Sequence, residues 1–216
     1  GPRMRLAVSE VAAMLGAGVM SDGRARFTGP VEGSRVDQEL LARGCWVLAL
    51  ATEVFRSAAA MGPLTRFHGG VTARDLLGLA PPAGLAQLAG FRHVFESTLI
   101  TRLAARTGPW TLGPVFTGSV LLAGPDGDLI AAGLLLDLKT SAKLTLTIKD
   151  LWQALGYALL DFDDDYGLDS AAIFSARYAY LATWDLAALL SDLAGHQVSL
   201  QSVRDEFHKL LHTHSA

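Results

Sequence analysis

The sequence predicts an α/β or α+β domain that carries a helical N-terminal part. The chain has 216 residues, of which 50% are hydrophobic and 18% charged, so it is long enough to bury a core and too apolar to be disordered. Apolar residues recur at helical spacing in the first half, whereas short apolar runs separated by glycine turns follow in the second. Such a change of period is typical of helices packed on a sheet.

Up to residue 106 the pattern predicts mainly helices. In the longest of them, apolar residues from Leu40 to Phe55 recur every three or four positions, and Gly62–Pro63 ends the pattern. In chain order, we expect an amphipathic helix over 4–17, a loop over 18–34, a helix from Arg35 to Met61, a short helix beginning at 72–75, a break at Pro81–Pro82, and a helix from Leu85 or Phe91 to Arg106.

After residue 107 the pattern predicts strands as well as helices. Thr147 and Asp150 have the spacing of a capping box, so a helix should begin there. In chain order, we expect a strand over 114–123, a turn over 124–127, hairpin strands over 128–132 and 134–139, a helix to Leu160, a solvated acidic loop over 161–169, a strand over 171–183, and helices over 183–193 and 198–212. The chain should therefore divide into a helical region, residues 1–90, packed on a core of residues 91–216.

The composition excludes several classes of protein. Cys45 is the only cysteine, which excludes a disulfide scaffold and also an iron–sulfur cluster or thiolate zinc site supplied by this chain alone. The longest apolar runs, Cys45–Ala51 and Leu129–Leu136, are far shorter than the ~20 residues that span a bilayer. We therefore expect no membrane partner, and with no secretory leader pattern we expect a cytoplasmic location.

Charge is distributed unevenly along the chain. Residues 1–106 contain twelve arginines, no lysine and eight acids, whereas residues 107–216 contain six bases and thirteen acids. This asymmetry predicts either a basic face beside an acidic pocket or scattered, solvated arginines. The arginines that we consider for phosphate contacts are Arg35, Arg43, Arg102 and Arg106.

The segment from Gly127 to Thr140 carries the most informative charges. If Ala132 and Gly133 form a two-residue hairpin turn, Asp128 lies directly opposite Asp137 on the neighbouring strand. Opposed carboxylates repel each other, and a divalent cation bound between them would remove that repulsion. Lys139 projects from the same sheet face as Asp137. The alternative interpretation is a surface hairpin with ordinary charges.

Two carboxylates beside an amine suit metal-assisted hydrolysis of a phosphodiester. Carboxylate oxygens select Mg²⁺ or Mn²⁺. A bound metal lowers the pKa of its water, and a nearby lysine such as Lys139 can orient that water or stabilise the charge that develops on phosphate.

The helix after the hairpin adds two polar side chains. Gln153 and Tyr157 are four residues apart and therefore lie on one helix face. Gln153 could offer its amide to a phosphate or a metal-bound water, and Tyr157 could position the backbone or stack on a base; alternatively, they are a surface glutamine and a core aromatic residue. Arg177 could contact phosphate or could belong to an ordinary edge strand.

The order of these features resembles the PD-(D/E)XK nuclease superfamily. The matching features are, in chain order, Gly127-Asp128, a hairpin, Asp137-x-Lys139, and a helix with Gln153-x-x-x-Tyr157. The helix with the Gln-x-x-x-Tyr pattern resembles that of the RecB-like exonuclease branch. The resemblance covers residues 91–185. It implies a restriction-endonuclease-like core, in which helices flank a mixed central sheet, and Mg²⁺-dependent cleavage of DNA.

The resemblance also implies roles for individual residues. Asp128 and Asp137 would be metal ligands, with the Leu138 carbonyl as the third, and Lys139 would be the catalytic lysine. The helix-borne residues Gln153 and Tyr157 would act on the substrate. The family often has a glutamate on the preceding helix, for which Glu96 is the candidate and Glu39 and Glu53 are rivals. Apart from the resemblance, we expect Lys143 and Arg177 to contact the substrate.

We therefore expect a metal-dependent nuclease that acts on DNA in restriction, repair or defence, as a homodimer or with a partner protein. The first alternative is a non-catalytic nucleic-acid-binding or scaffold module that keeps the nuclease fold. The second is an interaction subunit whose apolar helices, with Trp46 and Phe55, bury against another chain.

Overall fold

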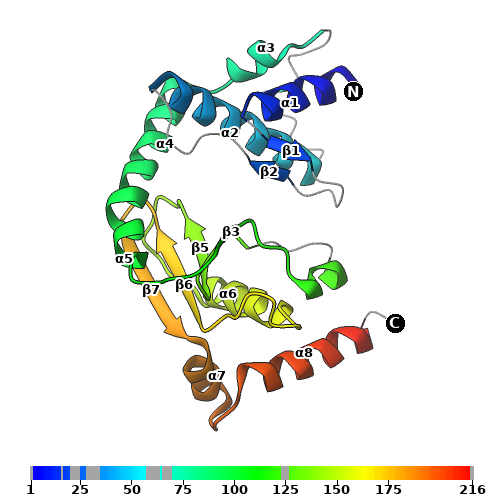
Figure 1. The fold of residues 1–216 in the computed structure, drawn as a ribbon, viewed down its shortest axis with the longest axis vertical. Coiled ribbons are helices and arrows are strands. Elements are labelled where there is room, and N and C mark those ends of the chain that lie inside the picture. Colours follow the sequence, from blue (N-terminus) through cyan, green and yellow to red (C-terminus); the bar gives the residue numbers. More distant parts are fainter. Residues whose placement is uncertain are drawn as a thin grey trace. The chain divides into compact units, whose positions relative to one another are not determined.

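The computed structural model describes residues 2–15, 17–19, 25–27, 35–56, 64, 70–122 and 127–214. The contacts of the chain divide it into two compact units, Gly1–Gly90 and Phe91–Ala216 (Figure 1). The packing of the first unit on the second stays a prediction.

The first unit is mainly helical. Its core contains Val11, Val47 and Leu76, which are fully or almost fully buried, and comes from three helices. Thr72 and Asp75 form a capping box, so the predicted start of the short helix is confirmed. The elements are α1 (Pro2–Met14), the antiparallel strands β1 (Ala17–Val19) and β2 (Ala25–Phe27), α2 (Arg35–Arg56) and α3 (Ala73–Leu77).

This unit differs from the sequence-based expectation in its predicted loop, and its long helix is described only in part. The loop predicted over 18–34 is wrong at residues 18–19 and 25–27, which belong to the paired strands β1 and β2. Residues 20–24 and 28–34 lie outside the described part of the chain. The helix predicted to reach Met61 is described to Arg56, and residues 57–61 also lie outside the described part.

A continuous helical run leads into the second unit. It comprises α4 (Pro82–Val94), the π-helical segment η3 (Phe95–Ile100) and α5 (Thr101–Leu103). The run begins at Pro82, earlier than either predicted start, because proline at the first helical position lacks only an N–H that would have no partner there.

The second unit is built on a five-stranded sheet, so the predicted α/β class is confirmed (Figure 1). The strand order is β3-β4-β5-β6-β7; β5 and β6 are parallel and the other neighbours are antiparallel, which makes the sheet mixed. Its elements are β3 (Trp110–Leu112), η4 (Thr117–Leu122), β4 (Leu129–Ala131), β5 (Leu134–Lys139), α6 (Ile148–Leu160), β6 (Ser170–Ser175), β7 (Tyr180–Asp185), α7 (Leu186–Ala194) and α8 (Leu200–His214).

Buried side chains cover both faces of this sheet. On one face, Leu99 packs with Leu136 and the other inward residues of β4 and β5. On the opposite face, Leu135 packs with Leu155 of α6. Because side chains alternate along a strand, Asp137 and Lys139 lie on the same face as Leu135, which is the face that α6 covers.

Two strand predictions for this unit are wrong. Within 114–123, residues 117–122 form the 3₁₀ helix η4, because Ser119 turns its hydroxyl back to accept a hydrogen bond from the N–H of Phe116 and is itself buried. The strand predicted over 171–183 is two strands, β6 and β7, joined by a turn in which Ala179 has a φ of 52°. No glycine, proline or asparagine marks that turn in the sequence.

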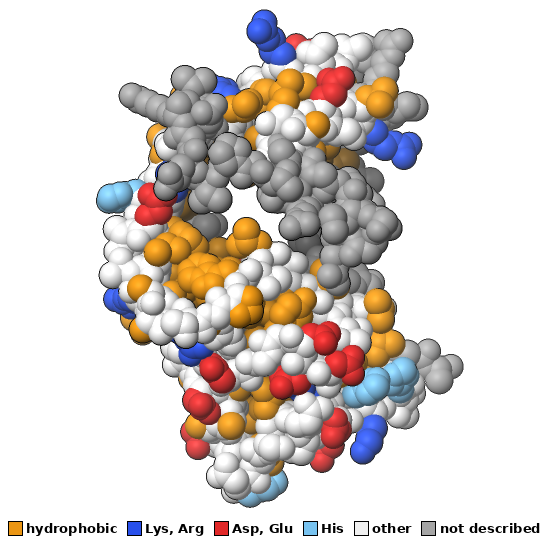
Figure 2. Space-filling view, viewed as in Figure 1, with side chains coloured by type: hydrophobic (Ala, Val, Ile, Leu, Met, Phe, Trp, Pro, Cys, Tyr) orange, Lys and Arg blue, Asp and Glu red, His pale blue; other side chains and the backbone are white. Residues whose placement is uncertain are grey.

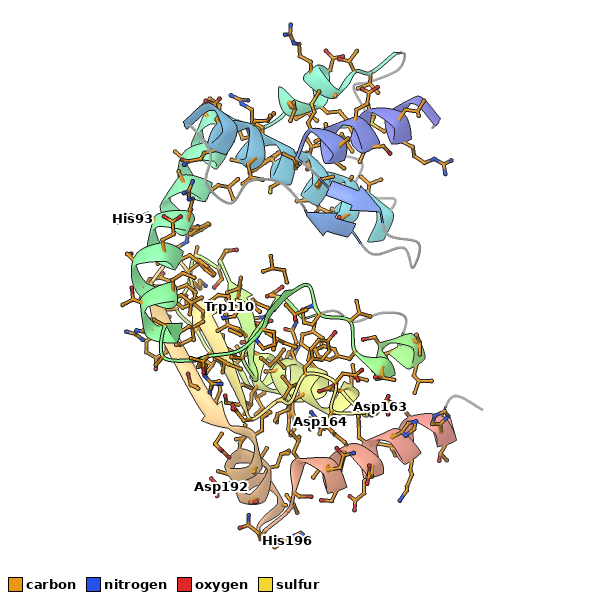
Figure 3. All side chains as sticks on the ribbon, in the orientation of Figure 1. His93, Trp110, Asp163, Asp164, Asp192 and His196 are labelled. Carbon is orange, nitrogen blue, oxygen red and sulfur yellow. The ribbon has the colours of Figure 1, made fainter. Side chains whose placement is uncertain are left out.

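The acidic loop after α6 also differs from expectation, because Asp161 is buried rather than solvated. Its Oδ2 lies 3.1 Å from Nη2 of Arg204, a buried side chain of α8. Nη1 of Arg204 lies 2.6 Å from Asp164, which Figure 3 labels beside α8. Burial raises the pKa of Asp161, and the charge of Arg204 opposes that shift. This network ties the end of α6 to α8.

Candidate active site

A two-residue turn joins β4 to β5. Ala132 has a φ of 47° and Gly133 a φ of 83°, and two left-handed residues give the turn whose twist suits a hairpin. Glycine is also required by space, since a Cβ on Gly133 would lie 2.9 Å from the carbonyl oxygen of Gly167. Leu129 therefore pairs with Leu136, as the predicted register requires.

This register brings the two predicted aspartates together. Asp128 lies one residue before Leu129 and so across from Asp137. Its Oδ2 accepts a hydrogen bond of 2.7 Å from the N–H of Leu138, which fixes the carboxylate against β5. Asp128 is exposed, whereas Asp137 is 5% exposed. One carboxylate is thus open to solvent and the other is held at the base of the site.

The environment of Asp137 makes its negative charge costly. Burial raises the pKa of Asp137, the ammonium of Lys139 opposes that shift, and the charges of Asp128 and Asp150 add to it. Oδ2 of Asp137 is buried and makes no hydrogen bond to any described residue, although Nζ of Lys139 lies 2.9 Å away. This contact is an ion pair whose geometry falls short of a hydrogen bond, so the oxygen keeps lone pairs available to a cation.

Lys139 connects the hairpin to α6. Its Nζ donates a hydrogen bond of 2.9 Å to Oε1 of Gln153 and lies 3.5 Å from Oδ1 of Asp150. Burial by itself would lower the pKa of Lys139, but the carboxylates of Asp137 and Asp150 outweigh burial and raise it. The amine is therefore a protonated group at neutral pH, held by contacts on two elements.

The start of α6 places three polar side chains on the face that meets Lys139. Thr147 caps the helix, and its N–H donates a hydrogen bond of 2.8 Å to Oδ2 of Asp150. Asp150, Gln153 and Tyr157 follow at spacings of three and four and so share one face. Nε2 of Gln153 donates a hydrogen bond of 2.9 Å to the hydroxyl of Tyr157.

Asp150 is a member of this site that sequence reasoning missed. The capping box gives Asp150 a local structural role, so the sequence alone does not indicate its second contact, the one with Lys139. Its spacing of three residues from Gln153 is the sequence signal that could have revealed it.

Other predicted residues are not joined to this network by any recorded hydrogen bond or ion pair. Glu96 is exposed on η3, where its Oε1 pairs with Nε of Arg92 at 2.7 Å. Lys143 is exposed between β5 and α6. Arg177 lies in the turn between β6 and β7, not on a strand, with its guanidinium carbon 5.3 Å from the ring centre of Phe91.

Two of the arginines considered for phosphate contacts, and one of the two rival glutamates, make other contacts. Arg43 pairs with Glu39 at 2.7 Å, and Glu53 is exposed on the same helix. Arg106 donates to the carbonyl of Ala132 at 3.0 Å and to Ser170, and pairs with Asp169, so it supports the hairpin turn. Arg102 is exposed, and the side chain of Arg35 lies outside the described part of the chain.

The donor set fits a hard divalent cation. Mg²⁺ is commonly held by one or two carboxylates and keeps several of its waters, and Asp128 and Asp137 supply two carboxylates. Among the described residues, no group of three or more His, Cys, Asp or Glu side chains is arranged to hold a metal ion. A cation here would thus be bound by the two aspartates, a backbone oxygen such as that of Leu138, and water.

Acidic side chains gather on the second unit in Figure 2, in the region where Figure 3 labels Asp163 and Asp164. These residues belong to the loop that Arg204 anchors, not to the carboxylate pair of the hairpin. The acidic appearance of that surface therefore does not mark the candidate site.

No helix within the described residues is both long and apolar enough to cross a membrane. In comparisons with protein-family models, with curated proteins and with solved structures, the chain has no match. The geometry of Asp128, Asp137, Lys139, Gln153 and Tyr157 is therefore what bears on its function.

Proposed function

We propose that the protein is a metal-dependent nuclease that hydrolyses phosphodiester bonds of DNA, with a restriction-endonuclease-like core of the PD-(D/E)XK type and a RecB-like helix. The observation that carries the proposal is the contact between Lys139 and Gln153, because it joins the hairpin to α6. The side chains of Asp137, Lys139, Gln153 and Tyr157 are thereby linked in one chain of contacts. Asp128, the fifth residue that the sequence predicts, joins them through the N–H of Leu138. Restriction, repair or defence against foreign DNA are the processes in which we place this activity.

The carboxylates of Asp128 and Asp137 would hold Mg²⁺ or Mn²⁺. When bound, the metal would supply Lewis-acid chemistry and a water of lowered pKa. The buried Oδ2 of Asp137 suits this role, since a cation would neutralise a charge that burial makes costly.

Lys139 would stabilise the charge that develops on the scissile phosphate. Its ammonium is held by Asp137 and Gln153, so it would need little rearrangement during the reaction. The hydroxyl of Tyr157 accepts a hydrogen bond from Gln153, which leaves its own proton free to be donated to a phosphate oxygen. Gln153 thus contacts both donors, the ammonium of Lys139 and the hydroxyl of Tyr157.

The test is cleavage of linear DNA, circular DNA and RNA with Mg²⁺ or Mn²⁺. Lys139→Ala and Asp137→Asn should each reduce cleavage by about 100-fold or more, as the loss of a preorganised charge does in other enzymes. Lys209→Ala is the matched control, because Lys209 is exposed on α8. Cleavage retained in both site variants would reject the proposal, and metal-independent DNA binding without cleavage would favour the non-catalytic module.

A further inference from the structure

The outer face of α6 presents an exposed tryptophan beside the candidate site. Trp152 is 56% exposed and directly precedes Gln153 in the chain. Leu144, Leu146 and Ile148, in the segment before it, are also exposed. A large aromatic side chain left this open costs solvation free energy, and such surfaces mark binding sites more often than scattered apolar residues do.

Gly156 leaves the side of α6 that follows Trp152 without a side chain. The two residues are four apart on α6, and a side chain at position 156 would lean back toward residue 152. A Cβ at Gly156 would have no atom within 4 Å, so crowding does not require glycine there. The backbone does not require it either, because Gly156 is helical and is not among the residues of positive φ. Glycine is a poor helix former, and a larger side chain at this position would extend toward Trp152.

The segment that leads to Trp152 is rich in lysine, and Asp137 and Asp150 flank it. Three of the four lysines of the chain, Lys139, Lys143 and Lys149, fall between residues 138 and 149, and this stretch contains no aspartate or glutamate. Lys143 and Lys149 are exposed. Lys149 precedes Trp152 by three residues and therefore lies on the same side of α6. An exposed indole flanked by lysines suits a polyanion that also offers flat rings.

We propose that Trp152 is a stacking platform for a base of single-stranded nucleic acid, whose backbone runs past Lys149 and Lys143 toward Lys139. The proposal rests on the proposed function and specifies its substrate. Bases within a duplex are already stacked on both faces, whereas an unpaired base can stack on an exposed ring. The proposed platform lies close to the candidate site along α6, because Trp152 and Gln153 are adjacent in the chain.

The test measures binding without cleavage. Fluorescence anisotropy in EDTA compares a labelled single-stranded oligonucleotide with the same sequence as a duplex. Trp152→Ala should weaken single-strand binding by roughly 5- to 150-fold and duplex binding much less, as expected for loss of one stacked base. Trp152→Phe should restore most of the loss. Gly156→Leu should also weaken single-strand binding, although leucine favours the helix, because its side chain would cover the indole.

Trp110→Ala is the matched control. Trp110, labelled in Figure 3, is also exposed. Its strand partner Ala131 belongs to the core cluster on the sheet face that α6 does not cover. This variant should bind single strands as the unaltered protein does. Thermal unfolding of each variant establishes that it is folded.

The outcomes separate this inference from the proposed function. Wild-type affinity in both Trp152→Ala and Gly156→Leu would overturn the inference, even if cleavage depends on Lys139. Equal losses for single strand and duplex would overturn it too, as would a Trp152-dependent dimer or vesicle binding in the absence of oligonucleotide binding. Conversely, Trp152-dependent single-strand binding without metal-dependent cleavage would support the platform and reject the nuclease.

Discussion

The amine of Lys139 lies 2.9 Å from Oδ2 of Asp137, a buried oxygen that has no hydrogen bond from the described residues. Lys139→Ala should therefore lower the free energy of unfolding by about 1 to 3 kcal/mol, because it leaves a buried carboxylate without its cation. The same substitution should cost less in an Asp137→Asn background. Urea unfolding of both single variants and the double variant measures the coupling, and an identical cost in the two backgrounds would contradict it.

Metal binding should stabilise the folded protein. A cation at 100 times its dissociation constant adds about 2.7 kcal/mol, which corresponds to a rise in Tm of about 5 to 10 °C for a chain of this size. Calorimetric scans with and without Mn²⁺ should show this rise in the wild type and its loss in Asp128→Asn and Asp137→Asn. Asp192→Asn, on α7, is the control that should keep it (Figure 3). A rise that survives in both site variants would place the metal elsewhere.

The capping box of α6 should make stability depend on pH. Hydrogen bonds from Thr147 lower the pKa of Asp150, so the ionised form stabilises the folded state. This contribution is complete above the pKa of Asp150 in the unfolded chain and is lost as the pH falls through the lower pKa of the folded state. Thr147→Ala should lower the free energy of unfolding by about 1 kcal/mol at neutral pH and by less in acid. A pH-independent difference in urea unfolding would argue against the assignment.

The hairpin turn offers a stabilising substitution. Alanine is unfavourable in the left-handed conformation that Ala132 adopts, whereas asparagine tolerates it and commonly precedes glycine in such turns. Ala132→Asn should raise the free energy of unfolding by about 1 kcal/mol. Gly133→Ala should lower it, since the new Cβ would meet the carbonyl oxygen of Gly167. Thermal unfolding of the two variants should shift in opposite directions, and shifts of the same sign would refute the turn geometry.

The buried pair of Asp161 and Arg204 should be critical for stability. Arg204→Ala is expected to lower the free energy of unfolding by about 3 to 5 kcal/mol, because a buried carboxylate would lose its partner. Asp164→Asn removes a contact of the same arginine at an exposed side chain and should cost below about 1 kcal/mol. Chemical denaturation compares them, and similar costs would show that burial of Asp161 is unimportant.

Local rules account for the features that the sequence predicts well. The capping boxes at Thr72 and Thr147 need residues only three apart, and the register that opposes Asp128 to Asp137 follows from the two-residue turn between them. Helix spacing likewise puts Gln153 and Tyr157 on one face. The hairpin half and the helix half of the candidate site could therefore each be derived from short stretches of sequence.

Contacts between distant segments decided the rest. Asp161 is buried, although its local sequence suggests a solvated loop. The partner of Asp161 is on α8, and the second contact of Asp150 is with a lysine on β5. By itself the sequence determined short-range geometry, because turns, caps and helix faces depend on neighbouring residues. Only the tertiary structure decided which charges are buried and which elements meet, because burial and pairing are set by the packing of the whole unit.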